Sequence, residues 1–81
     1  MNERARQTQP VRTAADLGAA IRRARRSQHL TLAQLSGLSG LGVRFLSELE
    51  RGKPTAQLGK ALEIASLLGL GLAVDIGEVS D

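Results

Sequence analysis

The segment that most constrains the fold is residues 30–53, LTLAQLSGLSGLGVRFLSELERGK. Its apolar residues recur at helical spacing on both sides of a glycine-containing turn, and Gly52 follows the second helical pattern as a stop signal. Two short helices joined in this way form the layout of a helix-turn-helix, whose second helix enters the major groove of DNA. The segment therefore predicts a unit that binds double-stranded DNA.

Capping signals predict where the first helix begins and ends. Thr13 and Asp16 have the spacing of a capping box, so we expect a helix that starts at Thr13 and ends near Gln28. Its inner face is formed by Leu17, Ala20, Ile21 and Ala24. His29 is the only histidine of the chain, and we interpret it as a left-handed cap residue rather than as a ligand or a base.

A second capping box, Thr31 with Gln34, starts the next helix. Residues 39–41 form the turn, and Gly42 is the expected N-cap of a third helix that runs to about Arg51. The second helix is expected to point three leucines inward, namely Leu32, Leu35 and Leu38.

A fourth helix is predicted over residues 56–68, and the period of the sequence changes after it. The inner stripe expected for this helix is Leu58, Ala61, Leu62, Ala65 and Leu68. Apolar residues then alternate with others over residues 70–77, as in a strand with one apolar face, at Leu70, Leu72, Val74 and Ile76. Since no other stretch resembles a strand, we expect pairing with the same strand of a second copy in a homodimer. The alternative is an irregular extension that lies along the fourth helix.

The charges divide the chain into a basic body and an acidic end. Formal charge is +5 over residues 1–30, +2 over residues 31–60 and −4 over residues 61–81. This distribution favours a polyanionic partner for the body, although arginine is also a common solvated helix residue. We divide the chain into four segments: a flexible basic arm (residues 1–12), a helix-turn-helix domain (13–69), a dimerisation strand (70–77) and an acidic tail (78–81).

The third helix has an outer face suited to base recognition. Residues near the start of such a helix reach base edges, and those expected to do so are Val43, Arg44, Ser47 and Glu48. Arg44 matches guanine O6 and N7, and Val43 matches a thymine methyl. Glu48 either accepts a hydrogen bond from cytosine N4 or orients Arg44 four residues before it. The expected phosphate contacts are Thr31, Gly42, Arg51 and Lys53, and Arg4, Arg6 and Arg12 of the arm add sequence-independent contacts.

Several functional classes are not expected. The chain has no cysteine and one histidine, without a phosphate loop or metal-ligand spacing, so we predict neither an enzyme nor a metal or cofactor site. The run GLGLAV lacks a following helix and is not a dinucleotide loop. The uncharged, mostly apolar stretch at residues 64–74 is too short to cross a bilayer. The first ten residues have no apolar run of a secretion signal, so we expect a cytoplasmic protein, associated with the nucleoid when it is bound to DNA.

The residues of the predicted helices and turns resemble a known protein family. Residues 14–69 are similar to the lambda-repressor-like, Xre-type helix-turn-helix domains, most clearly in LERGK at residues 49–53. The phrase RFLSELERGKPTAQLGKALEIASLLGLGLAV resembles the HipB-like antitoxins in particular. The resemblance implies a mainly α fold of four to five helices with a strand that pairs across a homodimer. It also implies a repressor that binds a palindromic operator in its own promoter and pairs with a HipA-like kinase toxin.

The resemblance further implies a structural ion pair between Arg25 and Glu50. Two residues depart from the family pattern. Leu32 stands where the family usually has a phosphate-binding glutamine, and Phe45 replaces a small hydroxyl residue and is expected to pack toward a subunit partner or the fourth helix. Two alternatives stay open: a stand-alone Xre-type regulator without a toxin, and a protein-interaction module that has lost DNA binding.

Overall fold

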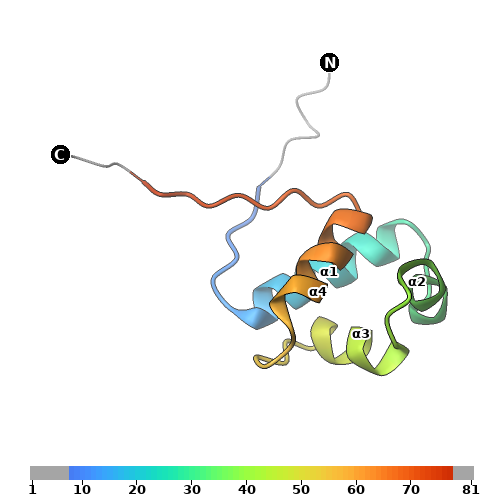
Figure 1. The fold of residues 1–81 in the computed structure, drawn as a ribbon. Coiled ribbons are helices and arrows are strands. Elements are labelled where there is room, and N and C mark those ends of the chain that lie inside the picture. Colours follow the sequence, from blue (N-terminus) through green and yellow to red (C-terminus); the bar gives the residue numbers. More distant parts are fainter. Residues whose placement is uncertain (1–7, 78–81) are drawn as a thin grey trace, which may run out of the picture.

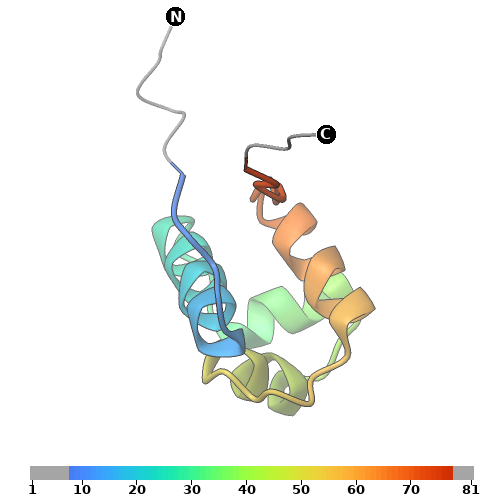
Figure 2. The same cartoon turned by 90° about the vertical axis from the view of Figure 1, so that its left-hand side faces the viewer.

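The computed structural model describes residues 8–77, which form a mainly helical domain. The part of the chain that it describes contains four helices, α1 (Ala14–Ser27), α2 (Leu32–Ser39), α3 (Val43–Glu50) and α4 (Leu58–Leu67) (Figure 1). In Figure 2, α3 lies along the lower edge of the domain, and α1 and α4 rise on either side of it. The predicted mainly α fold is confirmed. Residues 1–7 of the predicted arm and the predicted tail, 78–81, lie outside the described residues.

The local signals in the sequence set the helix starts. In both capping boxes the threonine oxygen accepts a backbone N–H, from Asp16 to Thr13 and from Gln34 to Thr31, each over 3.0 Å. The return bonds are also made: the backbone N–H groups of Thr13 and Thr31 donate to the side-chain oxygens of Asp16 and Gln34. His29 has a φ of 60°, as expected for a cap in the left-handed region. The starts of α1 and α2 and the end of α1 depend on contacts between residues a few positions apart in the chain, which is why the sequence predicts them.

The core lies where the four helices converge. Each helix contributes at least one buried apolar side chain, and the central set is Ile21, Leu35, Leu46, Leu49, Ala61, Ile64 and Leu68. Gly18 is buried in α1 at the crossing with α3, where the backbones of the two helices come close together. The α3 helix is therefore held against the core from one side only.

The prediction for the fourth helix was wrong in two respects. The helix begins at Leu58 rather than at residue 56. The Leu58 side chain is 65% exposed and Leu62 is also exposed, whereas the unpredicted Ile64 is fully buried. Because apolar residues occur on almost every side of this helix, its sequence does not define one inner face, and packing against α1 and α3 selects the stripe that includes Ile64.

The prediction that Leu38 faces inward was also wrong. Its side chain is 62% exposed at the end of α2, while Leu35 is completely buried. Leu41, in the connection after Gly40, packs against the core instead. The left-handed conformation of Gly40, with a φ of 78°, turns the chain so that Leu41 rather than Leu38 covers this part of the core.

Leu70 packs against the core, and residues 71–77 extend away from the domain. The backbone of Leu70 is bonded to Ala65, and no strand occurs among the residues that the structure describes. Val74 and Ile76 are 86% and 74% exposed, which is unusual for side chains of this kind. Figures 1 and 2 both show this segment leaving the domain at the end opposite to α3. Strand pairing with a second copy stays a prediction, because it requires another chain.

Candidate nucleic-acid interface

The α3 helix separates its core side from its solvent side. Leu46 and Leu49 are buried, whereas Val43 is 45% exposed and the Arg44 side chain is 91% exposed. Gly42 is the N-cap, and no side chain bonds the first N–H groups of the helix. The start of α3 therefore presents backbone donors and two exposed side chains together, which is the arrangement needed at a groove of DNA.

The predicted base-contacting residues lie on two successive turns of this outer face. Val43 and Arg44 are exposed, and Ser47 and Glu48 are half-buried one turn later. The hydroxyl oxygen of Ser47 accepts a hydrogen bond from Arg51 Nη1 over 3.1 Å. This hydrogen bond thus joins Ser47, which is predicted to contact bases, to Arg51, which is predicted to contact phosphate.

Glu48 is bound to two cations. Its Oε2 lies 3.4 Å from Arg44 Nε, and its Oε1 lies 3.1 Å from Lys53 Nζ. These partners hold the pKa of the Glu48 carboxyl below its ordinary value, first through the Lys53 hydrogen bond and then through Arg44. The sequence allowed the contact with Arg44 but gave no indication of the contact with Lys53, which depends on how the chain turns after α3.

The phosphate candidates surround α3. The Thr31 oxygen accepts the capping bond at the start of α2, so its hydroxyl hydrogen is free to donate. Arg51 and Lys53 are exposed just after α3. Among the arm residues, Arg4 and Arg6 lie outside the described residues, and Arg12 is exposed while its backbone N–H donates to Asp16.

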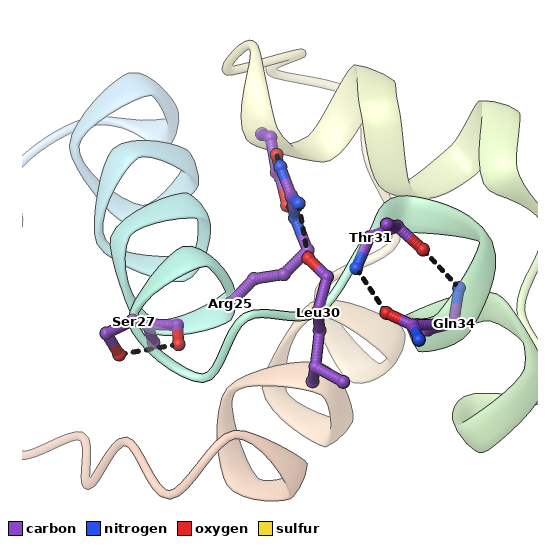
Figure 3. A network of polar contacts seen from close by, with 7 residues as sticks. Arg25, Ser27, Leu30, Thr31 and Gln34 are labelled. Atoms are coloured by element: carbon purple, nitrogen blue, oxygen red, sulfur yellow. Dashed lines mark hydrogen bonds and ion pairs between the residues drawn. The ribbon is translucent and has the colours of Figure 1, made fainter.

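Arg25 and Glu50 form a bidentate ion pair that joins α1 to α3. Arg25 Nε lies 2.7 Å from Glu50 Oε2, and Arg25 Nη2 lies 2.9 Å from Oε1. Arg25 Nη1 also donates to the Leu30 carbonyl over 2.8 Å (Figure 3). The two side chains are only 11% and 6% exposed, and the hydrogen bonds to Glu50 raise the pKa of the Arg25 guanidinium. One guanidinium therefore fixes the end of α3 relative to α1 and to the connection before α2.

The two departures from the family pattern have clear positions. Leu32 is half-buried and packs against the core, and its aliphatic side chain has no donor for phosphate. Phe45 turns toward α4, where Lys60 Nζ lies 5.8 Å from the centroid of its ring. Lys60 was not predicted as a neighbour of the interface, because only the fold places α4 beside α3.

Residues 8–77 show no sign of two other kinds of site. Within this range no group of histidine, aspartate or glutamate side chains is arranged to hold a metal ion. None of the helices described is long and apolar enough to cross a membrane. The outer face of α3 and its basic surroundings are the candidate site.

Comparisons with known proteins agree with this geometry. A family model described as helix-turn-helix matches residues 21–74. The uncharacterized HTH-type transcriptional regulator y4mF of Sinorhizobium fredii is 47% identical over 66 residues, which cover 82% of this chain and 84% of that protein.

Two solved structures share the fold. A complex of a HipB variant with an O2 20-mer superposes with a TM-score of 0.78 at 19% identity, covering 89% of this chain and all of that one. A complex of HipB with an O4 20-mer has a TM-score of 0.77 at 18% identity and covers 88% of this chain. At these identities the likeness concerns the fold.

Proposed function

The chain belongs to the Xre, lambda-repressor-like helix-turn-helix family of transcriptional regulators, and on this premise we propose that it is a sequence-specific repressor of its own promoter. Regulators of this family bind DNA and are not enzymes. The repressor acts in the cytoplasm as a homodimer on a palindromic operator. The observation that carries the proposal is the exposed start of α3, with Val43 and Arg44 directed away from the core.

The arrangement around α3 supports a groove-binding function. Base edges are reached by side chains near the start of a recognition helix, and phosphates by helix N-termini and flanking basic groups. Here Val43 and Arg44 occupy the first role, and Thr31, Arg51 and Lys53 occupy the second. The solved neighbours are both complexes with 20-mers, which supports a nucleic acid as the partner.

The homodimer is supported by the C-terminal segment. Three apolar side chains of the expected strand are exposed in the single chain, namely Leu72, Val74 and Ile76. An unpaired strand also leaves its backbone groups without hydrogen-bond partners. Pairing with a second copy covers the exposed apolar side chains and satisfies these backbone groups. Because this segment leaves the domain opposite to α3 (Figure 1), pairing there leaves both recognition helices free for DNA.

The finer assignment is an antitoxin of a HipBA-like operon. It is supported by the sequence resemblance of residues 44–74 to HipB-like antitoxins and by the fold shared with HipB. On this proposal, the neighbouring gene encodes a HipA-like kinase toxin. Co-expression tests it: the kinase alone arrests growth, and the present chain restores it. Absence of a kinase-like reading frame beside the gene would favour a stand-alone regulator.

Fluorescence anisotropy of the purified protein tests DNA recognition. The probes are a duplex taken from immediately upstream of its own gene and a scrambled duplex of equal length, each titrated over a series of salt concentrations. We expect tighter binding to the upstream duplex, two chains per site and an affinity that falls steeply with salt, since phosphate contacts release counterions. Equal binding to both duplexes, or binding that ignores salt, would contradict the proposal.

A further inference from the structure

Glu48 connects the two kinds of DNA contact expected at α3. Its Oε2 faces Arg44, the candidate for base recognition, and its Oε1 faces Lys53, a candidate for phosphate binding. A carboxylate this close to DNA would be repelled by the phosphates if it stood alone. Two bound cations offset its charge, which makes its presence on the recognition face compatible with DNA binding.

The atom through which Glu48 binds Arg44 determines which N–H groups of Arg44 stay available for DNA. Glu48 accepts from Nε, at 3.4 Å, and the structure gives no bond to the Nη1 or Nη2 group of Arg44 within the described residues. Guanine is recognised by two parallel N–H groups that meet O6 and N7. An arginine held by its Nε keeps both terminal amino groups available for this fork.

We propose that Glu48 is a positioning residue that holds Arg44 by its Nε, so that the terminal amino groups of Arg44 face the base edges, while Lys53 anchors the same carboxylate. Glu48 itself contacts no base. This inference rests on the proposed function, and it assigns to Glu48 the role of increasing the protein's preference for one DNA sequence over others. An arginine held in place before binding loses less side-chain freedom when the complex forms.

A double-mutant cycle on sequence preference tests the inference. The variants are Glu48→Ala, Arg44→Ala and the double variant, measured on the upstream and the scrambled duplex. We expect Glu48→Ala to lower the ratio of the two affinities about 5-fold per half-site, the scale of one ordered side chain. In the Arg44→Ala background, Glu48→Ala is expected to leave the ratio unchanged, because no guanidinium remains to be positioned.

Two further variants separate positioning from charge and from folding. Glu63→Ala removes the same charge from the exposed surface of α4 and is expected to leave the preference unchanged. Glu48→Gln retains an oxygen that accepts from Arg44 Nε and is expected to restore part of the preference. Thermal melting of each free variant checks that the fold is kept, which is expected because alanine and glutamine both suit a helix.

Three results would overturn the inference. A loss of preference from Glu48→Ala that persists in the Arg44→Ala background would mean that Glu48 contacts a base directly. Equal tightening on both duplexes would mean that Glu48 only repels phosphate. A wild-type protein without preference for the upstream duplex would refute the proposed function itself, and this is known before any variant is compared.

Discussion

Gly18 of α1 packs directly against the backbone carbonyl of Leu49 in α3. A Cβ atom at residue 18 would overlap that carbonyl oxygen and lie 2.8 Å from the carbonyl oxygen of Glu50. These are backbone atoms of a helix and have little freedom to move aside. The absence of a side chain at Gly18 therefore determines how close the recognition helix lies to α1.

We expect Gly18→Ala to lower the free energy of unfolding by about 2 to 3 kcal/mol, because overpacking at a backbone contact forces the helices apart. Urea denaturation measures the change. Gly37→Ala is the matched control, since a Cβ at Gly37, in α2, meets nothing within 4 Å. This second change should stabilise the fold by up to about 1 kcal/mol, the gain of alanine over glycine in a helix. Equal effects of the two substitutions would contradict the close crossing.

Removing one member of the Arg25–Glu50 pair should be more harmful than removing both. Arg25→Met leaves a nearly buried carboxylate and the Leu30 carbonyl without their donors, at an expected cost of about 3 kcal/mol. The double variant Arg25→Met with Glu50→Leu removes both charges and should recover about half of that loss. Thermal or urea unfolding measures both values. A single variant with the melting temperature of the wild type would mean that the pair does not stabilise the domain.

Arg44→Ala and Lys53→Ala should weaken DNA binding in different ways. Loss of Arg44 should reduce the preference for the upstream duplex by about 1 to 3 kcal/mol per half-site, the value of one base contact. Loss of Lys53 should mainly weaken binding to all duplexes and lower the salt slope by about 1, with a smaller loss of preference than Arg44→Ala because Arg44 still holds Glu48. Anisotropy on the upstream and scrambled duplexes distinguishes the two patterns. Equal losses on both duplexes for Arg44→Ala would argue against base recognition by that residue.

A charge on the apolar side of the C-terminal segment should prevent dimerisation. Val74→Asp places a carboxylate among the side chains expected to pack across the pair, so the variant should sediment as a monomer. Its affinity for the upstream duplex should fall about 100-fold, because the two half-sites are then bound independently. Ala73→Asp, on the opposite side of the strand, is the control and should remain a dimer. Sedimentation of the wild type as a monomer would refute the pairing.

Acid should destabilise the domain through two carboxyl groups. The pKa of Asp16 lies below its ordinary value of 3.8, first because the N–H of Arg12 donates to it, and the pKa of Glu48 lies below 4.5, first because Lys53 donates to it. Because folding lowers both pKa values, their stabilisation is complete above the unfolded-state values and is lost as the pH falls through the lower folded-state values.

We therefore expect the free energy of unfolding to decrease as the pH falls below about 4. Asp16→Asn should show a smaller decrease over the same range, since one of the two titrating groups is gone. Urea denaturation at neutral and at acidic pH measures the difference. Asp75→Asn, in the extended C-terminal segment, serves as the control and should follow the wild type. An Asp16→Asn variant with unchanged pH dependence would show that the cap does not contribute.

Sequence alone predicts the parts of this fold that depend on near neighbours. The capping boxes at Thr13 and Thr31, the left-handed His29 and the N-cap Gly42 all involve residues within a few positions. The inner face of α4 was not predictable in this way. With apolar residues around most of its circumference, only its contacts with the other helices bury Ile64 and expose Leu58.

At the candidate site, too, only the features that depend on local periodicity were predictable from the sequence. The outer residues of α3 follow from helical periodicity, so Val43 and Arg44 were predictable from the sequence. The contacts of Glu48 with Lys53 and of Phe45 with Lys60 join residues from different segments. They depend on the turn after Gly52 and on the path of α4, and sequence periodicity carries no information about either.

The division of α3 into a buried and an exposed side has a consequence for how such a regulator diversifies. Leu46 and Leu49 hold the helix in the domain, while Val43 and Arg44 contribute almost nothing to the core. On the proposed function, exchanging the exposed pair is expected to alter the preferred DNA sequence at little cost in folding. After gene duplication, two copies with the same scaffold can thus acquire separate operators in a few substitutions, and a laboratory library at these positions follows the same route to mutually independent regulators.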